Sequence, residues 1–325
     1  MSRLWNQIFF LVFVCFSGLA QQQQVADSLR LVYEADTLKG EAKMELLELL
    51  VFNEMKDADL ALSYAEELID LARGAQNYRY LYGGYLQKGH KFFMQNDLDR
   101  ALPAYQKASE AAKKSKDKRA EATALMFQGF VYYDSGEPDR AVALVEECIA
   151  LFRDPEVRDQ EGVTETLAAA LMNLGNIYLQ EDELVKAGIN FQDAAEIYRN
   201  LGARTELTYV LGNQGMIYAG LGDHTKAEEN LTRAIQLFEE DGNYDPIAEY
   251  QITLAEVYWD QGEFKKAHDL AEEGLGHAER LKKKELISRA SGVLAKLDFQ
   301  SGDYKEAYEH QMMFMQYKDS MDVET

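Results

Sequence analysis

The chain has 325 residues, of which 47% are hydrophobic, and its 56 acidic residues outnumber its 34 lysines and arginines to give a formal net charge of −22. This acidic balance argues against a nucleic-acid-binding protein, because neutralising phosphate groups requires lysine and arginine. The length is sufficient to bury a large apolar surface. Only four prolines occur, which suits a mainly helical chain.

Residues 1–20 have the features of a secretory signal peptide. Arg3 supplies a positive start, residues 8–16 form an apolar run, and Gly18, Leu19 and Ala20 fit the small residues of a cleavage site. The apolar run is too short to span a bilayer as a stable helix. We expect cleavage after Ala20 and a secreted or periplasmic mature protein without a stable membrane span; a buried N-terminal helix is the alternative.

Residues 21–41 are expected to form a linker and a capping helix. The stretch 25–35 is amphipathic, with apolar residues at Leu29, Leu31 and Val32. We expect this helix to cover the first unit of the repeat array that follows.

A repeat of about 40 residues fills residues 42–325. Six intervals separate seven units, and five of them are 40 residues long, while the interval between the third and fourth units is 46. The units start at Ala42, Tyr82, Ala122, Ala168, Thr208, Ala248 and Ser288. Position 20 of every unit is alanine, namely Ala61, Ala101, Ala141, Ala187, Ala227, Ala267 and Ala307. Position 8 is glycine or alanine in six units, and position 11 is aromatic in six, Asp298 of the seventh being the exception.

This pattern predicts pairs of antiparallel helices. Two helices approach closely only where side chains are small, so positions 8 and 20 mark the contact within a pair. The aromatic residue at position 11 and the apolar residue near position 24 are expected to fill the gap between neighbouring pairs. Position 15 carries glycine, asparagine or aspartate in six units, residue types that tolerate a left-handed backbone at the end of a helix; Lys56 is the exception.

The unit resembles the tetratricopeptide repeat, whose signature is a small residue at position 8, an aromatic at 11, alanine at 20 and an aromatic at 24. The resemblance implies an all-α fold, a right-handed superhelical solenoid of seven helix pairs, and a non-catalytic scaffold that binds a protein or peptide. The unit is six residues longer than the common 34. We expect the extra residues between one pair and the next, where Gly74, Gly202 and Gly242 are expected to stop helices.

The longer third interval contains Asp154, Pro155, Glu156 and Gly162, which predict a loop insertion of about six residues. This loop is either a projecting binding element or a passive bulge.

No catalytic or metal-binding motif occurs, and we predict no enzyme activity, no metal site and no cofactor. Cys148, the single cysteine outside the leader, is expected to be a small buried core residue. Five histidines are scattered over four units without metal-ligand spacing, namely His90, His224, His268, His277 and His310. The many paired carboxylates are typical of solvated helix faces.

The family resemblance places a binding groove on the concave side, along positions 2, 5, 6, 9, 12 and 13 of the first helix of each unit. Carried over, these positions give Met126, Phe130, Tyr133, Met172, Asn173, Asn176, Tyr209, Asn213, Met216, Glu256 and Trp259. Asn173 and Asn176 share one helix face, and their amides can both donate to and accept from the backbone of an extended peptide. The alternative is that these residues mainly pack the first helices against their neighbours.

The last unit ends on an apolar stretch that is a possible docking surface, formed by Met312, Met313, Phe314 and Tyr317. A leader, a 40-residue array and the closing residues 317–320 also resemble the extracytoplasmic sensor regions of some bacterial histidine kinases, nucleotide cyclases and related regulators. This second resemblance implies a sensor module of a signal-transduction system acting through the apolar end. An end of the core without a partner is the alternative.

Overall fold

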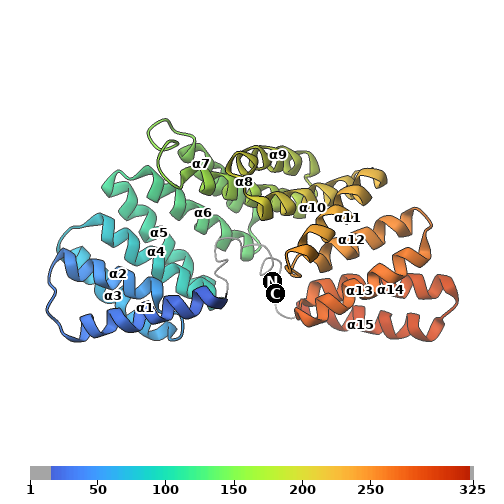
Figure 1. Ribbon diagram of the computed structural model, residues 1–325, viewed down its shortest axis with the longest axis horizontal. Helices are drawn as coiled ribbons and strands as arrows, with labels where there is room; N and C mark the ends of the chain where they lie inside the picture. Colours follow the sequence, from blue (N-terminus) through green and yellow to red (C-terminus); the bar gives the residue numbers. More distant parts are fainter. Residues whose placement is uncertain (1–15, 323–325) are drawn as a thin grey trace. The chain divides into compact units, whose positions relative to one another are not determined.

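The computed structural model describes residues 16–322, which contain fifteen α-helices and no strand (Figure 1). The described chain divides into two compact units, residues 16–170 and residues 171–322. The predicted signal peptide lies mostly in residues 1–15, outside the described residues, and residues 16–20 are helical.

The first unit contains seven complete helices and the start of an eighth. They are α1 (Phe16–Glu34), α2 (Glu41–Asn53), α3 (Ala58–Gly74), α4 (Tyr78–Met94), α5 (Leu98–Ser115), α6 (Lys118–Asp134), α7 (Pro138–Phe152) and α8 (Val163–Gln180). Pro138 is the first residue of α7, where its missing N–H costs nothing.

The second unit begins within α8 and contains seven further helices. They are α9 (Leu184–Leu201), α10 (Arg204–Gly220), α11 (His224–Glu240), α12 (Ile247–Asp260), α13 (Phe264–Arg280), α14 (Lys284–Ser301) and α15 (Tyr304–Asp322). Among the described residues, no helix is both long enough and apolar enough to cross a membrane.

Consecutive helices form antiparallel pairs joined by short turns (Figure 1). We call the first helix of each pair the A helix (α2, α4, α6, α8, α10, α12, α14) and the second the B helix. The prediction of an all-α solenoid of antiparallel helix pairs is confirmed.

Small residues bring the two helices of a pair together. All seven alanines at position 20 are buried. A Cβ atom added at Gly89 would lie 2.6 Å from the ring of Tyr105, and one added at Gly175 would lie 2.7 Å from that of Phe191. The side chain at position 24 therefore packs on the glycine of its own pair. Tyr105 also stacks on Phe127 of the next pair, with ring centroids 5.4 Å apart. The side chain at position 24 therefore fills the space within its own helix pair and the space between that pair and the next.

The aromatic ring at position 11 lies beneath a cation from position 19 in five units. The pairs are Phe92–Arg100, Tyr132–Arg140, Tyr178–Lys186, Tyr218–Lys226 and Tyr258–Lys266, at 4.5–5.4 Å from charge to ring centroid. The same cations pair with the acidic residue at position 16, three residues earlier, which is the N-cap of each B helix. Each turn is thus stabilised by a ring, a cation and a carboxylate.

The turns within the pairs adopt the predicted left-handed backbone. Position 15 has a positive φ in six units, from 58° at Asn96 to 91° at Gly302. The first turn differs, because the buried carboxylate of Glu54 accepts hydrogen bonds from the backbone N–H groups of Lys56 and Asp57. Glu54 also forms an ion pair with Arg30, which ties α1 to this turn.

Between most pairs the extra residues of the 40-residue unit lengthen the helices, which corrects the expectation that they lie between pairs; residues 241–246, between α11 and α12, lie between pairs as expected. Only residues 116 and 117 separate α5 from α6. Gly202 and Gly242 adopt positive φ at helix ends, as expected, at 68° each. Gly74 is still helical, and Gln76 takes the left-handed conformation with φ 51°.

The insertion of residues 153–162 is anchored to the first unit. Val157 is buried, and Lys118 donates a hydrogen bond of 2.9 Å to Asp154. Cys148 is buried as predicted.

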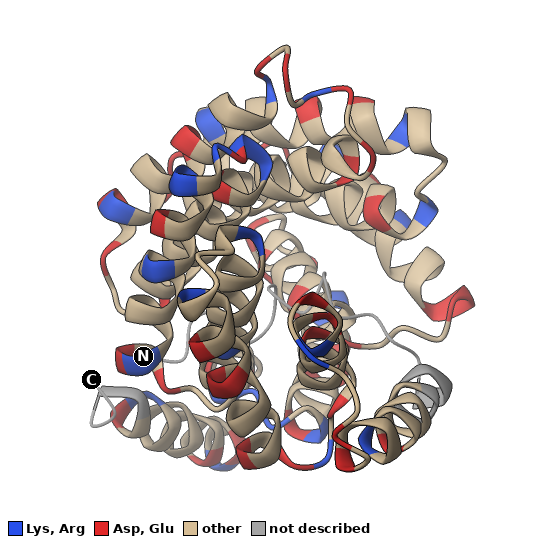
Figure 2. Cartoon of the chain, turned by 90° about the vertical axis from the view of Figure 1, so that its left-hand side faces the viewer, with Lys and Arg blue, Asp and Glu red and all other residues tan. Residues whose placement is uncertain are grey.

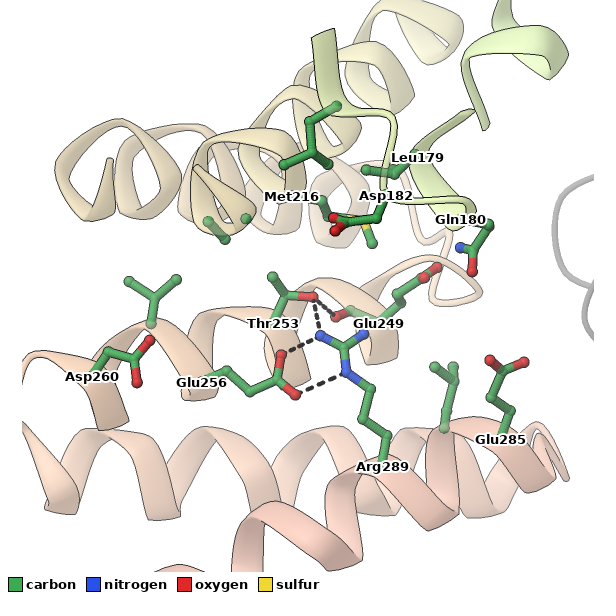
Figure 3. Close-up of a pocket in the computed structure, with 15 residues that line it drawn as sticks. Leu179, Gln180, Asp182, Met216, Glu249, Thr253, Glu256, Asp260, Glu285 and Arg289 are labelled. Atoms are coloured by element: carbon green, nitrogen blue, oxygen red, sulfur yellow. Dashed lines mark hydrogen bonds and ion pairs between the residues drawn. The ribbon is translucent and has the colours of Figure 1, made fainter. Parts of the chain in front are cut away.

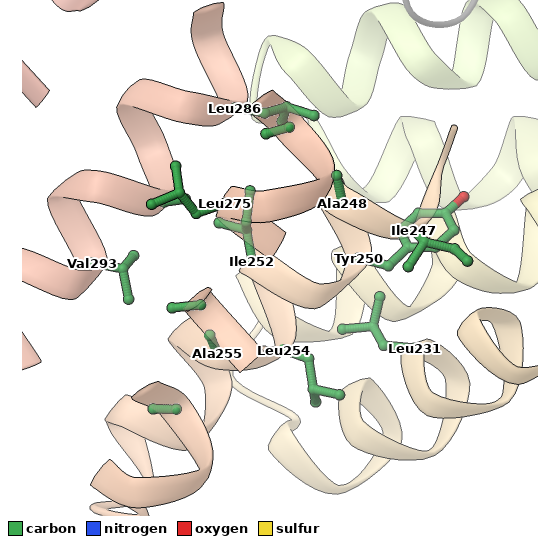
Figure 4. Packing of buried hydrophobic residues seen from close by; sticks show 14 of the residues in the cluster. Leu231, Ile247, Ala248, Tyr250, Ile252, Leu254, Ala255, Leu275, Leu286 and Val293 are labelled. Atoms are coloured by element: carbon green, nitrogen blue, oxygen red, sulfur yellow. The ribbon is translucent and has the colours of Figure 1, made fainter. Parts of the chain in front are cut away.

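Each of the two compact units, residues 16–170 and residues 171–322, has its own apolar core. In the first unit, a cluster that includes Leu47, Leu50 and Leu68 is covered by Leu29 and Tyr33 of α1. In the second unit, a larger cluster joins α11 to α14 (Figure 4). Tyr250 and Ile247 are fully buried there, and Leu231 contacts this cluster from α11.

Candidate functional site

Most of the residues predicted to line the groove are buried in the structure. The buried ones are Met126, Phe130, Tyr133, Met172, Asn173, Asn176 and Asn213. Their burial agrees with the alternative that these residues mainly pack the A helices against their neighbours.

The amides of the second unit bind each other. Asn213 Nδ2 donates to Asn176 Oδ1 over 2.8 Å, and the Tyr250 hydroxyl donates to Asn213 Oδ1 over 3.1 Å. This chain of hydrogen bonds links α8, α10 and α12. The same donors and acceptors are then not available to an extended peptide, because a buried polar group already has its partner within the protein.

The remaining four predicted residues are partly accessible. The Tyr209 hydroxyl accepts a hydrogen bond from Asn243 over 3.3 Å, and Trp259 packs against Phe264 with ring centroids 5.2 Å apart. Met216 and Glu256 line a cavity.

This cavity has a volume of about 470 Å³ and lies between A helices of the second unit (Figure 3). The volume falls within the range of ~300–1,000 Å³ that is usual for ligand pockets. Its walls come from α8, α10, α12 and α14, with Asp182 of the turn between α8 and α9 and Leu184, the first residue of α9. The lining residues are Leu179, Gln180, Asp182, Leu184, Met216, Ala219, Gly220, Glu249, Thr253, Glu256, Val257, Asp260, Glu285, Leu286 and Arg289.

A guanidinium occupies the middle of this lining. Arg289 Nε donates to Glu256 Oε1 over 2.9 Å, and Arg289 Nη2 donates to Thr253 Oγ1 over 2.9 Å and to Glu256 Oε2 (Figure 3). Burial lowers the pKa of Arg289, but the hydrogen bond and charge of Glu256 outweigh it, with the charges of Glu249 and Glu285 adding to the effect. The pKa of Arg289 is therefore raised, and the side chain stays charged.

Carboxylates dominate the polar part of the cavity. Asp182, Glu249, Glu256, Asp260 and Glu285 are acidic, and Arg289 is the one basic residue in the lining. Elsewhere on the described chain, acidic and basic residues are interspersed along the helices (Figure 2). The cavity wall thus combines carboxylates with apolar groups from Leu179, Met216 and Val257.

Sequence reasoning missed most of this cavity, although a signal for it was present. Thr253, Asp260 and Arg289 occupy positions 6, 13 and 2 of their units, which are among the groove positions of the family. Glu285 and Leu286 precede position 1 of the last unit. They reach the cavity because the A helices are longer than those of the common repeat.

The predicted docking end has two sides. Met313 and Tyr317 pack against the core of the second unit, and a Cβ added at Gly292 would lie 3.1 Å from the ring of Phe314. Met312 is exposed, together with Tyr308 and Met315 of the same helix.

Two of the histidines meet at one carboxylate. His268 Nε2 lies 2.9 Å from Asp298 Oδ1, and His310 Nδ1 lies 2.6 Å from Asp298 Oδ2. Asp298 is buried at position 11 of the last unit, where other units have an aromatic ring. Within residues 16–322, no group of three or more His, Cys, Asp or Glu residues is arranged to hold a metal ion.

A family model described as tetratricopeptide repeat matches residues 84–154, 166–240 and 204–280, more than half of the chain. The helix pairs and their small contact residues had already defined the class, a helical-repeat scaffold of the kind that binds other proteins through an extended surface. The chain belongs to the tetratricopeptide repeat family. No curated protein matches its sequence.

Solved structures share the fold at low sequence identity. A signal transduction ATPase with a tetratricopeptide repeat sensor from Pyrococcus horikoshii has a TM-score of 0.63 and 17% identity, with 94% of this chain and 48% of that chain covered. A Rap protein complexed with competence and sporulation factor has a TM-score of 0.58 and 14% identity, with coverage of 94% and 98%. BtubC from P. vanneervenii has a TM-score of 0.58 and 20% identity, with coverage of 69% and 91%. At these identities the likeness shows the fold alone.

Proposed function

We propose that this protein is a non-catalytic scaffold that acts outside the cytoplasm and binds a protein or peptide through the concave surface of its A helices. The observation that carries the proposal is the cavity of about 470 Å³, whose walls come largely from four successive A helices. In the family these helices line the concave side. The Rap protein solved with competence and sporulation factor supports the proposal by analogy.

The binding surface can be tested by selecting a random decapeptide library on the purified full chain. Selected peptides are expected to lose binding when Met216→Arg fills the cavity, because Met216 lines it from α10. Leu221→Arg is the matched control, since Leu221 is exposed and follows α10 outside the cavity. A library that yields no binder, or binders indifferent to Met216→Arg, would contradict the proposal.

Action outside the cytoplasm rests on the sequence of residues 1–20. Mass spectrometry of the protein expressed in a bacterium should find a mature N-terminus at Gln21 in the extracytoplasmic fraction. A chain that keeps its leader and stays with the cytoplasmic fraction would rule this part out.

A second candidate function is the sensor module of a bacterial signalling system. The exposed outer side of α15, with Tyr308, Met312 and Met315, favours it, because a transmitting end needs a surface for its output partner. A sensor should transmit occupancy of the cavity to α15. Hydrogen exchange with and without a selected peptide measures this, and unchanged protection of α15 would favour the simple scaffold.

A further inference from the structure

We propose that the outer face of α15 binds a second copy of this chain, with the two α15 helices antiparallel about a twofold axis. This contact is independent of any ligand in the cavity. Exposed apolar side chains, their departure from the repeat pattern and the charges beside them support it.

The outer face of α15 carries an exposed apolar stripe. Tyr308, Met312 and Met315 follow each other at intervals of four and three residues, which places them on one side of the helix. They are 67%, 48% and 47% exposed. Another side of the same helix packs on α14 (Figure 1), with Met313 and Tyr317 against the core of the second unit. The stripe is thus separate from the side chains that hold α15 in the fold.

Met315 occupies a position that is covered in every preceding unit. Position 28 is buried in all six of them, at Ile69, Ser109, Ile149, Ala195, Ile235 and Leu275. Ile235 and Leu275 belong to the apolar core that joins α11 to α14, so position 28 is where a B helix contacts further helices. On α15, the last helix of the described chain, nearly half of the Met315 side chain stays exposed.

Met312 departs from the repeat pattern in a second way. Position 25 lies on the outside of the B helix and is polar in the six other units, at Glu66, Gln106, Glu146, Gln192, Thr232 and Glu272. A methionine at this position extends the apolar stripe onto a surface that the repeat otherwise keeps polar. Methionine also adapts its shape to an apolar partner. The two departures together indicate a contact surface on the outside of α15.

The charges beside the stripe favour a second copy as the partner. Lys305 lies seven residues before Met312 and Asp319 lies seven residues after it, and seven residues are close to two helical turns. All three are exposed and share one face. In an antiparallel pair with the two Met312 side chains at the axis, Lys305 of each copy meets Asp319 of the other, and Tyr308 meets Met315. A parallel pair would bring like charges together instead.

Lys305 also has a neighbour within its own helix. Its Nζ atom lies 3.5 Å from Glu309 Oε1, and both side chains are mostly exposed. An exposed ion pair of this kind is weak, so the lysine can turn to the carboxylate of a second copy.

The dimer is expected to be weak. One helix face buries less area than a standard interface, and each copy carries a net charge of −22 that repels the other. We expect a Kd on the order of 10–100 µM, so that the chain is mainly monomeric at about 2 µM.

The first experiment is sedimentation equilibrium of the purified full chain between about 2 and 500 µM, over which the mean mass should rise toward that of a dimer. Met312→Asp should raise the Kd at least about tenfold, because two carboxylates then meet at the axis. Ile189→Asp is the matched control, since it places the same charge on an exposed apolar position of the B helix α9, and it should leave the Kd unchanged. Equal loss in both variants would overturn the proposal. A chain that stays monomeric throughout would overturn it as well and leave this face to a different protein.

The second experiment exchanges the charges. Lys305→Glu alone and Asp319→Lys alone should each raise the Kd about three- to tenfold, because like charges then meet twice in the dimer. The double variant should bring the Kd back to within about twofold of the natural chain. Net charge alone would act differently, since Asp319→Lys makes the chain less acidic and would strengthen association. A dimer strengthened by Asp319→Lys, or one that the double variant does not restore, would overturn the proposal.

All of the substituted positions are exposed, so the variants are expected to fold, and their melting temperatures check this. Should Met312→Asp fail to fold, the charge exchange decides the question without it.

Discussion

Side-chain volume at single positions determines how closely the helices of a pair approach. Gly175 lies in α8 opposite Phe191 of α9, and the ring of Phe191 is fully buried. A close-packed interior has little room to move such a ring. The glycine at position 8 is therefore required by packing and not by its backbone conformation, since it lies within a helix.

Gly175→Ala should lower the free energy of unfolding by about 1–3 kcal/mol, because the new methyl group overlaps Phe191. Gly276→Ala is the control. Gly276 lies within α13 with no atom within 4 Å of an added Cβ, so alanine there should stabilise the protein by up to about 1 kcal/mol through helix propensity. Urea unfolding measures both. Equal effects would show that the close contact at position 8 is not decisive.

Asp134, at the end of α6, is a half-buried residue whose carboxylate oxygen Oδ1 is buried and has no hydrogen-bond partner among the described residues. Burial raises its pKa from 3.8 to about 7. Between these values the native state holds a proton that the unfolded chain releases. The contribution of the Asp134 carboxyl to the free energy of unfolding is therefore fully present below pH 3.8 and is lost as the pH rises through 7.

Asp134→Asn should remove this loss. Its advantage in unfolding free energy over the natural chain should grow by about 1–3 kcal/mol between pH 5 and pH 8. Urea unfolding at the two pH values measures the change. A constant difference would mean that the Asp134 carboxyl titrates below pH 5 in the folded state.

At the scale of elements, the last three helices are joined by one carboxylate. Asp298 of α14 contacts His268 of α13 and His310 of α15 through its two oxygens. Polar contacts of this kind fix which way helices pack, because a buried oxygen without a donor is costly.

Asp298→Ala should lower the unfolding free energy by about 1–3 kcal/mol and speed hydrogen exchange in α15, because both histidines lose their partner. The control is Asp319→Ala, which removes an exposed carboxylate from α15. It should change the free energy of unfolding by less than about 0.5 kcal/mol. Unchanged exchange in α15 of the Asp298 variant would contradict the proposed link between the helices.

At the scale of the whole molecule, the net charge of −22 is a destabilising feature. Like charges repel more strongly in the compact state than in the expanded chain. The charge is spread over helix surfaces with basic residues between the acidic ones (Figure 2), so local ion pairs relieve only part of the repulsion.

Raising NaCl from about 20 mM to 500 mM should therefore raise the melting temperature by a few degrees, because salt screens the repulsion over about one Debye length. Differential scanning calorimetry measures it. A melting temperature that falls with salt would show that the surface ion pairs outweigh the net repulsion.

The sequence by itself determined the helix pairs of the fold. Alanine at position 20 and glycine at position 8 recur because two helices touch only where both are small, and a left-handed turn needs Gly, Asn or Asp at position 15. These requirements act within each repeat, so the residue types that meet them recur at a fixed interval in the sequence. The aromatic residue at position 11 and the cation at position 19 also recur, although only the structure shows that they are paired.

The tertiary structure decided which side of each A helix is accessible. Asn176 and Asn213 have the residue type that a peptide groove uses, but their amides bind one another between neighbouring helices. Arg289 and Thr253 meet only because α12 and α14 pack side by side. Which side chains of neighbouring repeats are buried or paired depends on how successive helix pairs are rotated relative to each other. That rotation results from many contacts, and no single residue type marks them in the sequence.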